Sequence, residues 1–473
     1  MNDIYKEFLI KCAGFGDPPF DEELDEILPK WKLAAKKLGL TEEDIKYAMN
    51  VWIPRNFDIK SEGVRKTIGA YLAEVVDLMM ADEYKRKGCK LVYGVLPAHP
   101  PFYRALKFTD PTIQTYFPDA ALTQFLGPFL HKIYPFLEEA EAHGMRYGCR
   151  HCALNKVRYA ALRRGLIPMP DVSWIWGFVC DQAPKSDEFI KEIWNEKYPT
   201  IFSRIPHDQP AHKTEHEDEE RVKYLASIMR EGYEETCKRL GIDMDEKAIK
   251  DAFNERTSYL LKYSELATLE ASDPPPVDGN IFSVFLANTF SIVFNTGYKY
   301  FNPALDATLK EAKERVKRGE GIVPKGSPRG MAWFLPAFNP FIARMFWENG
   351  VALVFGEGLL PSKADLQPPK FKDPFEMNAE ALLKWSLVVN WGRKADLAIE
   401  KLETYRLDFM IWGFLDFDRW LGSDHRLCAR YVEEKTGKPC FYIEGDIWED
   451  RDYSEEVLRT RIETICEIIK ARV

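Results

Sequence analysis

Three cysteines in the first half of the chain have positions that suit a metal centre. Cys149 and Cys152 form a Cys-x-x-Cys pair, a spacing that lets two thiolates reach one metal or cluster. Cys180 lies near the end of an apolar stretch, VSWIWGFVCD, at 172–181. Ligands of open α/β sheets gather at the carboxyl ends of such strands. The pattern predicts a metal centre at these three thiols, with three buried thiols as the alternative.

Two histidines lie close to the same expected strand ends. His151 stands between the cysteines of the pair, and His99 follows the apolar run CKLVYGVLPA at 89–98. An imidazole can act as general acid or base near neutral pH, so both are candidate catalytic residues. Ordinary loop histidines are the alternative.

A basic loop, KGSPRG, carries Lys325 and Arg329. Basic side chains beside free backbone amides suit a phosphate or pyrophosphate group. The chain contains neither the G-x-x-x-x-G-K-[ST] order nor a G-x-G-x-x-G fingerprint, so a nicotinamide cofactor lacks support. A plain basic surface loop is the alternative.

An acidic segment follows the last expected strand. Its carboxylates are Asp446, Glu449, Asp450 and Asp452. Clustered carboxylates can bind a hard cation, but they more often form a solvated turn that caps the next helix. In that turn Arg459 and Arg461 would pair with them locally, and we assign the segment no catalytic role.

Strand-like and helix-like stretches alternate along most of the chain. The expected strands are 89–98, 172–181, 200–206, 351–358, 407–415 and 440–450, and the stretch 321–338 is expected to contain a further strand and a Gly/Pro-rich loop. The expected helices are 121–142, 153–164, 220–240, 281–296, 376–405, 422–436 and 453–470. Runs that are apolar on both faces predict parallel strands covered by helices. We therefore expect an α/β protein with two doubly wound, mostly parallel sheets.

The segment ASDPPPVDGN at 271–280 is the strongest linker, because three consecutive prolines cannot lie inside a helix. It predicts a helical N-terminal extension at 1–85, a first α/β domain at 86–275 and a second at 276–473.

Composition excludes several classes of protein. The 473 residues include 65 basic and 74 acidic side chains, a net charge of −9, which argues against a dedicated nucleic-acid binder. No apolar run reaches the roughly 18 residues of a membrane span, and no signal peptide is recognisable, so we expect a cytoplasmic protein without membrane contact. The cysteine count of nine is odd, which disfavours a disulfide framework. The cysteines interpreted as ordinary thiols are Cys12, Cys89, Cys237, Cys440 and Cys466.

Several of these segments together resemble the 2-hydroxyacyl-CoA dehydratase / benzoyl-CoA reductase family. The resemblance is carried by YIEGDIWEDRDYS and EEVLRTRIETICEII near the C-terminus, by KGSPRGMAWFLPAFNPFIARMFWENGVALV, and by CALNK and VSWIWGFVCD in the first half. It covers about residues 145–473.

The resemblance implies an iron–sulfur enzyme subunit. Such a protein takes an acyl-CoA substrate, pairs with a second subunit in a heterodimer or homodimer, and receives one electron from an ATP-hydrolysing iron–sulfur activator protein. The thioester would be reduced to a ketyl radical anion, leading to loss of water or to reduction of an aromatic ring. A non-catalytic scaffold or electron-transfer subunit is the alternative.

The resemblance also implies site residues. Cys152 and Cys180 match the family's first two ligands of a [4Fe-4S] cluster. In relatives the third ligand tends to follow the strand corresponding to 407–415, where this chain has no cysteine, so Cys149 and Cys428 are its candidates. Lys325 and Arg329 would then face the phosphates of coenzyme A.

Overall fold

The computed structural model describes most of the chain. The described residues are 3–145, 151–177, 180, 182–205, 219–290, 292, 294–336, 338–360, 362, 367–414, 418, 422–451 and 453–472.

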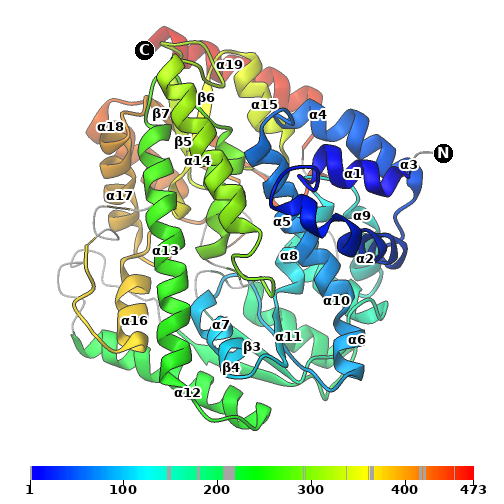
Figure 1. Ribbon diagram of the computed structural model, residues 1–473. Coiled ribbons are helices and arrows are strands. Elements are labelled where there is room, and N and C mark those ends of the chain that lie inside the picture. The colour runs from blue at the N-terminus through cyan, green and yellow to red at the C-terminus, as the bar shows by residue number, and fades with distance from the viewer. Residues whose placement is uncertain are drawn as a thin grey trace.

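Two four-stranded sheets, each entirely parallel, form the centre of the molecule (Figure 1). The first has the order β2-β1-β3-β4 and the second β6-β5-β7-β8. The strands are β1 Lys90–Tyr93, β2 Ile113–Tyr116, β3 Val172–Gly177, β4 Thr200–Arg204, β5 Arg329–Ala332, β6 Ala352–Gly356, β7 Phe409–Gly413 and β8 Cys440–Ile443. The expected fold class, α/β with two doubly wound parallel sheets, is confirmed.

Helices cover the sheets and fill most of the remaining chain. The α-helices up to α10 are α1 Ile4–Cys12, α2 Leu24–Lys37, α3 Glu42–Tyr47, α4 Ile53–Asn56, α5 Glu62–Met79, α6 Ala81–Arg86, α7 Pro100–Thr109, α8 Pro118–Leu126, α9 Tyr134–Ala142 and α10 Ala153–Arg163. The others are α11 Gln182–Ile193, α12 Glu219–Leu240, α13 Glu246–Glu270, α14 Phe301–Arg318, α15 Phe341–Glu348, α16 Pro374–Lys384, α17 Trp391–Thr404, α18 His425–Thr436 and α19 Glu455–Arg472.

The strands are short and apolar because helices bury both of their faces. Every residue of β6 and β7 is buried, and so are the first five residues of β3. Burial of Val, Ile, Leu and Trp side chains on both faces is what a parallel sheet requires. This explains why most strands could be recognised from sequence.

One strand was not expected. The β2 strand, IQTY, lies at the edge of the first sheet beside β1 and is fully buried. Its Thr115 amide donates to Oδ1 of Asn295 at 3.0 Å, so a side chain from another part of the chain covers part of this edge. The polar Gln114 and Thr115 break the apolar pattern that marks the other strands.

Three expected helices differ in the structure. The stretch 121–142 forms two helices, α8 and α9, because α8 ends at the Gly127-Pro128 break. The stretch 281–296 forms a π-helical segment, Ile281–Leu286, and a 3-10 turn, Ala287–Phe290. The stretch 376–405 is divided into α16 and α17.

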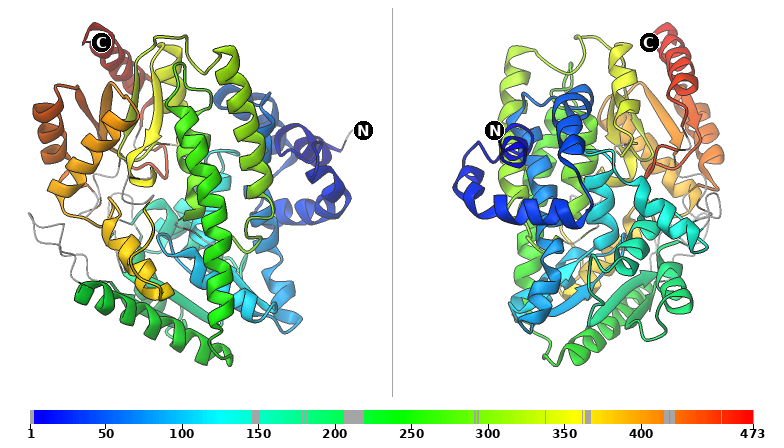
Figure 2. Two further views of the ribbon diagram at one scale, coloured as in Figure 1. Left: turned by 60° about the vertical axis from the view of Figure 1, so that its left-hand side comes forward. Right: turned by 90° about the vertical axis from the view of Figure 1, so that its right-hand side faces the viewer.

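The N-terminal helices pack closely on the rest of the molecule. The α5 helix is almost entirely buried and lies against α14 and α8. The long helices α13 and α14 flank the 271–300 segment and run side by side in both views (Figure 2). The domain limits 1–85, 86–275 and 276–473 stay a prediction. None of the helices in the described part of the chain is long and apolar enough to cross a membrane.

Candidate functional site

Two thiols lie at the starts of neighbouring helices at the carboxyl edge of the first sheet. Cys152 is the N-cap residue of α10, and Cys180 follows β3 directly before α11. The amide of Ala183 donates to the Cys180 sulfur at 3.4 Å. The nearby backbone amide of Asn155 opposes the rise in the pKa of Cys152, but the Cys152 side chain makes no capping hydrogen bond. Cys180 thus accepts an amide from three residues on, as N-cap side chains do, and Cys152 does not.

The two helix starts are joined directly. The side-chain amide of Asn155 donates to the carbonyl oxygen of Gln182 at 2.9 Å, and both residues are almost completely buried. The thiols are close enough that Cys180 contributes to the raised pKa of Cys152. The structure thus brings together the two cysteines on which the sequence interpretation depended most.

Burial raises the pKa of the Cys152 thiol well above its ordinary value, and Asp446, Cys180 and Asp119 raise it further. Without a cation nearby this thiol stays protonated at neutral pH. A metal supplies the positive charge that a thiolate needs, and it binds with release of the proton. Cys152 and Cys180 are two donors of the type that iron–sulfur clusters use.

The sequence offered two candidates for the third ligand, Cys149 and Cys428. Cys149 lies outside the described residues. Cys428 is buried in α18, where its sulfur donates to the Trp391 carbonyl at 3.4 Å. Burial and the Asp424 charge raise the pKa of Cys428. Within the described part of the chain no group of three His, Cys, Asp or Glu side chains is arranged to hold a metal ion.

The two histidines occupy different places. His151 is half-buried next to Cys152, its ring 5.2 Å from that of Phe189. Burial and Lys156 lower the pKa of His151, so its ring is neutral at pH 7. His99 is buried and stacks on Trp176, with ring centroids 5.8 Å apart.

Trp176 and Ile175 point to opposite faces of β3, since side chains alternate along a strand. Cys180 packs against a small cluster that contains Ile175, whereas His99 stacks on Trp176, whose side chain points to the other face of β3. Burial and the charge of Arg256 lower the pKa of His99 well below its usual value.

The structure does not bring Lys325 and Arg329 to this edge. Arg329 is the first residue of β5, and Lys325 precedes it, so both lie at the amino end of the second sheet. The Arg329 guanidinium donates to the carbonyls of Ala271 and Ser272 at 2.7 Å each. Lys325 is exposed.

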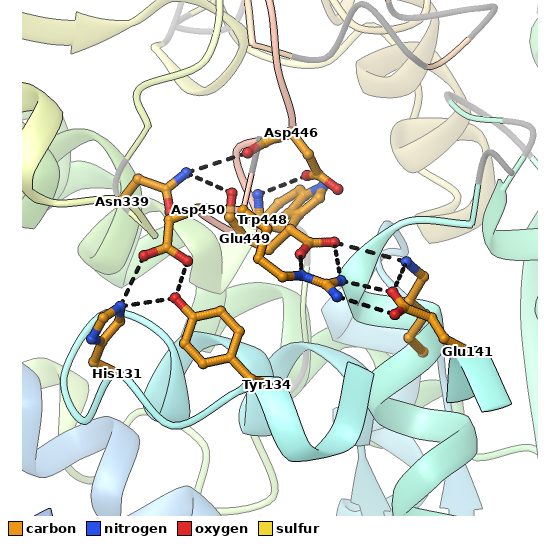
Figure 3. Close-up of polar contacts among 10 residues, drawn as sticks. His131, Tyr134, Glu141, Asn339, Asp446, Trp448, Glu449 and Asp450 are labelled. Carbon is orange, nitrogen blue, oxygen red and sulfur yellow. Dashed lines mark hydrogen bonds and ion pairs between the residues drawn. The ribbon is translucent and has the colours of Figure 1, made fainter. Parts of the chain in front are cut away.

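Asp446 and Glu449 of the acidic segment are buried, so the expectation of a solvated turn is wrong for these two residues, and Asp452 lies outside the described residues. Asp446 and Glu449 are 7% and 4% exposed. The side chain of Asn339, at the start of α15, donates to the carbonyls of Asp446 and Glu449 at 3.2 and 3.0 Å (Figure 3). Arg459 and Arg461 do not pair with Asp446, Glu449 or Asp450: the first binds Glu348 and Glu455, and the second donates to the Tyr442 carbonyl.

Two clusters attach this segment to the first half of the chain. In the first, Arg451 binds Glu141 at 2.7 Å and Glu449 at 2.9 Å, while Lys156 lies 2.8 Å from Glu141 and 3.8 Å from Glu449. Lys156 is one turn of α10 beyond Cys152. The C-terminal segment is thereby attached directly to the helix that carries the thiol.

In the second cluster, His131 and Tyr134 face Asp450 (Figure 3). His131 Nε2 is 2.8 Å from the carboxylate and 2.9 Å from the tyrosine hydroxyl, which also donates to Asp450. The His131 ring stacks on Trp52 with centroids 4.0 Å apart. The N-terminal helical region, the connection between α8 and α9, and the C-terminal segment therefore meet here.

Comparison with known proteins agrees with the sequence resemblance. Residues 126–469 match the model of the family described as 2-hydroxyglutaryl-CoA dehydratase, D-component. The chain belongs to this family. A benzoyl-CoA reductase subunit of Thauera aromatica is 20% identical over 342 residues, which cover 67% of this chain and 76% of that protein. The (R)-phenyllactyl-CoA dehydratase alpha subunit of Clostridium sporogenes is 23% identical over 351 residues, which cover 71% and 80%.

The family includes both enzyme types named in the sequence interpretation, and this chain is a subunit of that type. The sequence interpretation overlooked the amide of Asn155 and the buried Asp119. Asp119 had little signal, because the polar Gln114 and Thr115 conceal the strand that precedes its helix. Asn155 had none, because its partner is a backbone carbonyl 27 residues away.

Proposed function

We propose that the chain is an iron–sulfur subunit of a 2-hydroxyacyl-CoA dehydratase, with Cys152 and Cys180 as two ligands of a [4Fe-4S] cluster. The observation that carries the proposal is the paired position of these thiols at joined helix starts, where a backbone amide donates to the Cys180 sulfur. Amides directed at sulfur favour the thiolate that iron requires. Cys149 or Cys428 is the third ligand in this proposal.

The bound cluster would supply an electron at low potential, which no side chain can provide. The electron would arrive from an ATP-hydrolysing activator protein, and the acyl-CoA thioester would accept it as a ketyl radical anion. The hydroxyl group on the neighbouring carbon would then leave as hydroxide, and the next carbon along would lose a proton that converts the hydroxide to water. The electron would be returned as the carbon–carbon double bond forms. The half-buried His151, neutral at pH 7, would lie beside this chemistry as a proton carrier.

Reduction of an aromatic acyl-CoA ring is the alternative reaction, and the relatives include a subunit of each enzyme. A second subunit, in a heterodimer, would complete either enzyme. We place the activity in the cytoplasm of an anaerobic cell.

A scaffold role is the second candidate function. It is favoured because the described residues contain no third ligand beside Cys152 and Cys180. In that case the partner subunit alone would hold the reactive cluster.

The test is anaerobic purification followed by counting iron and sulfide on this chain alone. We expect about four irons per chain in the unaltered protein. Cys180→Ala should abolish the iron-dependent visible absorption while the far-ultraviolet circular dichroism is unchanged. Cys466→Ala is the matched control, because Cys466 is a buried thiol on α19. Cys428→Ala separates the two choices of third ligand.

A folded chain without iron that still associates with its partner would overturn the cluster proposal and support the scaffold role.

A further inference from the structure

The segment 446–451, which we call the strap, is attached on its two sides by contacts of different kinds. One side is fixed to the second sheet. The amide of Ile447 donates at 3.0 Å to the carbonyl of the residue that follows β7. The Asn339 side chain donates to strap carbonyls, and the Trp448 ring lies 4.6 Å from that of Phe338. Buried hydrogen bonds and ring packing make this side the stable attachment.

The other side of the strap meets α9 and α10 through charged groups. Arg451 of the strap binds Glu141 of α9 at 2.7 Å, and Glu141 also binds Lys156 of α10 at 2.8 Å. Burial would raise the pKa of Glu141, but Arg451 and Lys156 outweigh that effect, and the pKa lies below its ordinary value. Lysine and arginine side chains are charged at neutral pH. This contact therefore keeps its charges near neutral pH.

A second charged contact, between Asp450 and His131, differs in this respect. His131 Nε2 lies 2.8 Å from the carboxylate, and 30% of the His131 side chain is exposed, so solvent protons can reach the ring (Figure 3). Burial would raise the pKa of Asp450, but hydrogen bonds from His131 and Tyr134 outweigh that effect, and the pKa lies below its ordinary 3.8. The carboxylate is therefore charged at neutral pH, whereas an imidazole gains or loses its charge between about pH 5 and pH 8.

The groups around His131 make Asp450 its charged partner. Trp52 covers one face of the ring, with centroids 4.0 Å apart. The Tyr134 hydroxyl lies 2.9 Å from Nε2 and donates to Asp450. The charged groups further out are already paired with one another, namely Lys132 with Asp44 and Arg451 with Glu449. The charge of the imidazole is thus felt mainly by the strap carboxylate.

The backbone at His131 depends on these contacts. Its φ of 54° lies in the left-handed region, which a residue other than glycine rarely adopts. Such a conformation persists where neighbouring contacts hold it. The stack on Trp52 and the contact with Asp450 hold it here. A weaker contact with Asp450 therefore leaves this turn less firmly held.

We propose that the strap is a proton-sensitive clasp between the second sheet and the helices α9 and α10, closed most tightly when His131 carries a proton. Loss of that proton to solvent breaks no other bond. The neutral ring can still donate from Nε2 to the carboxylate, so the hydrogen bond stays and the charge attraction is lost. The clasp then opens more often, and the strap leaves α9 and α10 while it remains on the second sheet.

The consequence is that access to the start of α10 increases as the pH rises. Lys156, which the clasp covers, is one turn beyond Cys152 on that helix. Opening therefore uncovers the turn next to the thiol. The clasp requires no metal, so the inference stands or falls independently of the proposed iron–sulfur function.

The test is hydrogen exchange of the full chain at pH 5.5 and pH 8.5, measured by mass spectrometry on peptides that cover α9, the start of α10 and the strap. Each rate is divided by the intrinsic exchange rate at that pH, and a peptide from the middle of α13 reports global unfolding. In the unaltered protein we expect protection of the three peptides to be roughly threefold to fivefold lower at pH 8.5, the effect of one partly exposed ion pair. Protection of the α13 peptide should not change.

Two variants remove the proton-sensitive contact. His131→Asn should show the lower protection at both pH values. Asp450→Asn should do the same while it keeps the stack of His131 on Trp52. His143→Asn is the matched control, because His143 is 31% exposed and its ion pair and hydrogen bond both go to Glu139 within α9. It should keep the pH dependence of the unaltered protein.

Equal protection at the two pH values in the unaltered protein overturns the inference. A pH dependence that survives in Asp450→Asn also overturns it, and this variant decides the matter if His131→Asn does not fold. A loss of protection that appears equally in the α13 peptide reports global unfolding and likewise contradicts a local clasp.

Discussion

The side-chain amide of Asn155 donates a hydrogen bond to the carbonyl oxygen of Gln182, 2.9 Å away, and so joins the start of α10 to the start of α11. Cys152 and Cys180 occupy those two starts, which are held together by this contact and by the bonds of Arg158 to Ser186 and Asp187.

Replacing Asn155 should loosen the site. Asn155→Ala leaves a buried carbonyl without its donor, at a cost of about 1–3 kcal/mol in the free energy of unfolding. It should also lower the iron retained per chain, measured after anaerobic gel filtration. Asn349→Ala is the control, since that amide bonds to Met345 within one helix end. Equal iron loss in both variants would contradict a specific role for Asn155.

Removing the buried cation of α10 should destabilise the fold. Lys156→Met takes away a nearly buried partner of Glu141 and Glu449, and breaking a buried ion pair costs about 3–5 kcal/mol. Because Arg451 still binds both acids, we expect the lower end of this range in urea unfolding. Arg318→Met, at an exposed ion pair, should cost under about 1 kcal/mol. Similar losses in the two variants would show that the cluster contributes little.

The same cluster of Lys156, Glu141, Glu449 and Arg451 should make the free energy of unfolding fall at low pH. Burial alone would raise the pKa of Glu141, but Arg451 and Lys156 outweigh it, and the pKa lies below its ordinary 4.5. The stabilisation is therefore complete above pH 4.5 and is lost as the pH falls through the lowered pKa. Glu141→Gln should weaken the acid dependence of the unfolding free energy, and an unaltered profile would contradict this assignment.

Asp278 should have the opposite effect on the pH dependence of stability. Burial raises its pKa from 3.8 to about 8, so the folded chain holds a proton that the unfolded chain releases. Its contribution to stability is complete below pH 3.8 and is lost as the pH rises to about 8. Asp278→Asn should reduce the loss of stability between pH 5 and pH 8 in thermal unfolding. The amide fits because Oδ1 keeps the bond from Asn280. A steeper loss of stability with rising pH in the variant would contradict the assignment of Asp278 as a protonated carboxyl group in the folded protein.

The basic loop offers a test of where coenzyme A binds. Arg329→Ala should lower the melting temperature, because its guanidinium holds the carbonyls of Ala271 and Ser272. Lys325→Ala should leave the melting temperature unchanged, since Lys325 is exposed. Calorimetric titration with an acyl-CoA then decides the role of the loop. Unchanged affinity in Lys325→Ala places the phosphates elsewhere, and weaker affinity that is more marked at low salt places them at the amino edge.

The sequence was most informative where one local pattern decided the structure. Strands such as β3 and β6 are apolar on both faces, and this requirement of parallel sheets shows in the residues themselves. The β2 strand was not predicted, because a backbone amide at its edge donates to the side chain of Asn295, a residue 180 positions away in the chain.

The same reasoning explains the outcome at the site. The start of α10 is marked by the Cys-x-x-Cys spacing, and the start of α11 is marked by the end of the apolar strand β3. Local sequence is therefore enough to suggest that Cys152 and Cys180 lie close together. The burial of Asp446 and Glu449 depends on Asn339, Glu141 and Lys156, which lie far away in the chain. From the sequence alone, clustered acidic residues are interpreted as a solvated turn, because their distant partners are unknown. No local pattern distinguishes a solvated acidic turn from one that is buried by such partners.

The attachment of Glu449 and Arg451 to Lys156 and Glu141 also fixes the order of events during synthesis. The helix that carries Cys152 is made early, but the segment that packs against it comes after the last strand of the second sheet. A ribosome must therefore translate almost the whole sequence before the surroundings of this thiol are complete. Loading of any metal into the finished site is a step that follows synthesis of that segment, and a protein truncated before Asp446 would expose an unfinished thiol site to oxidation.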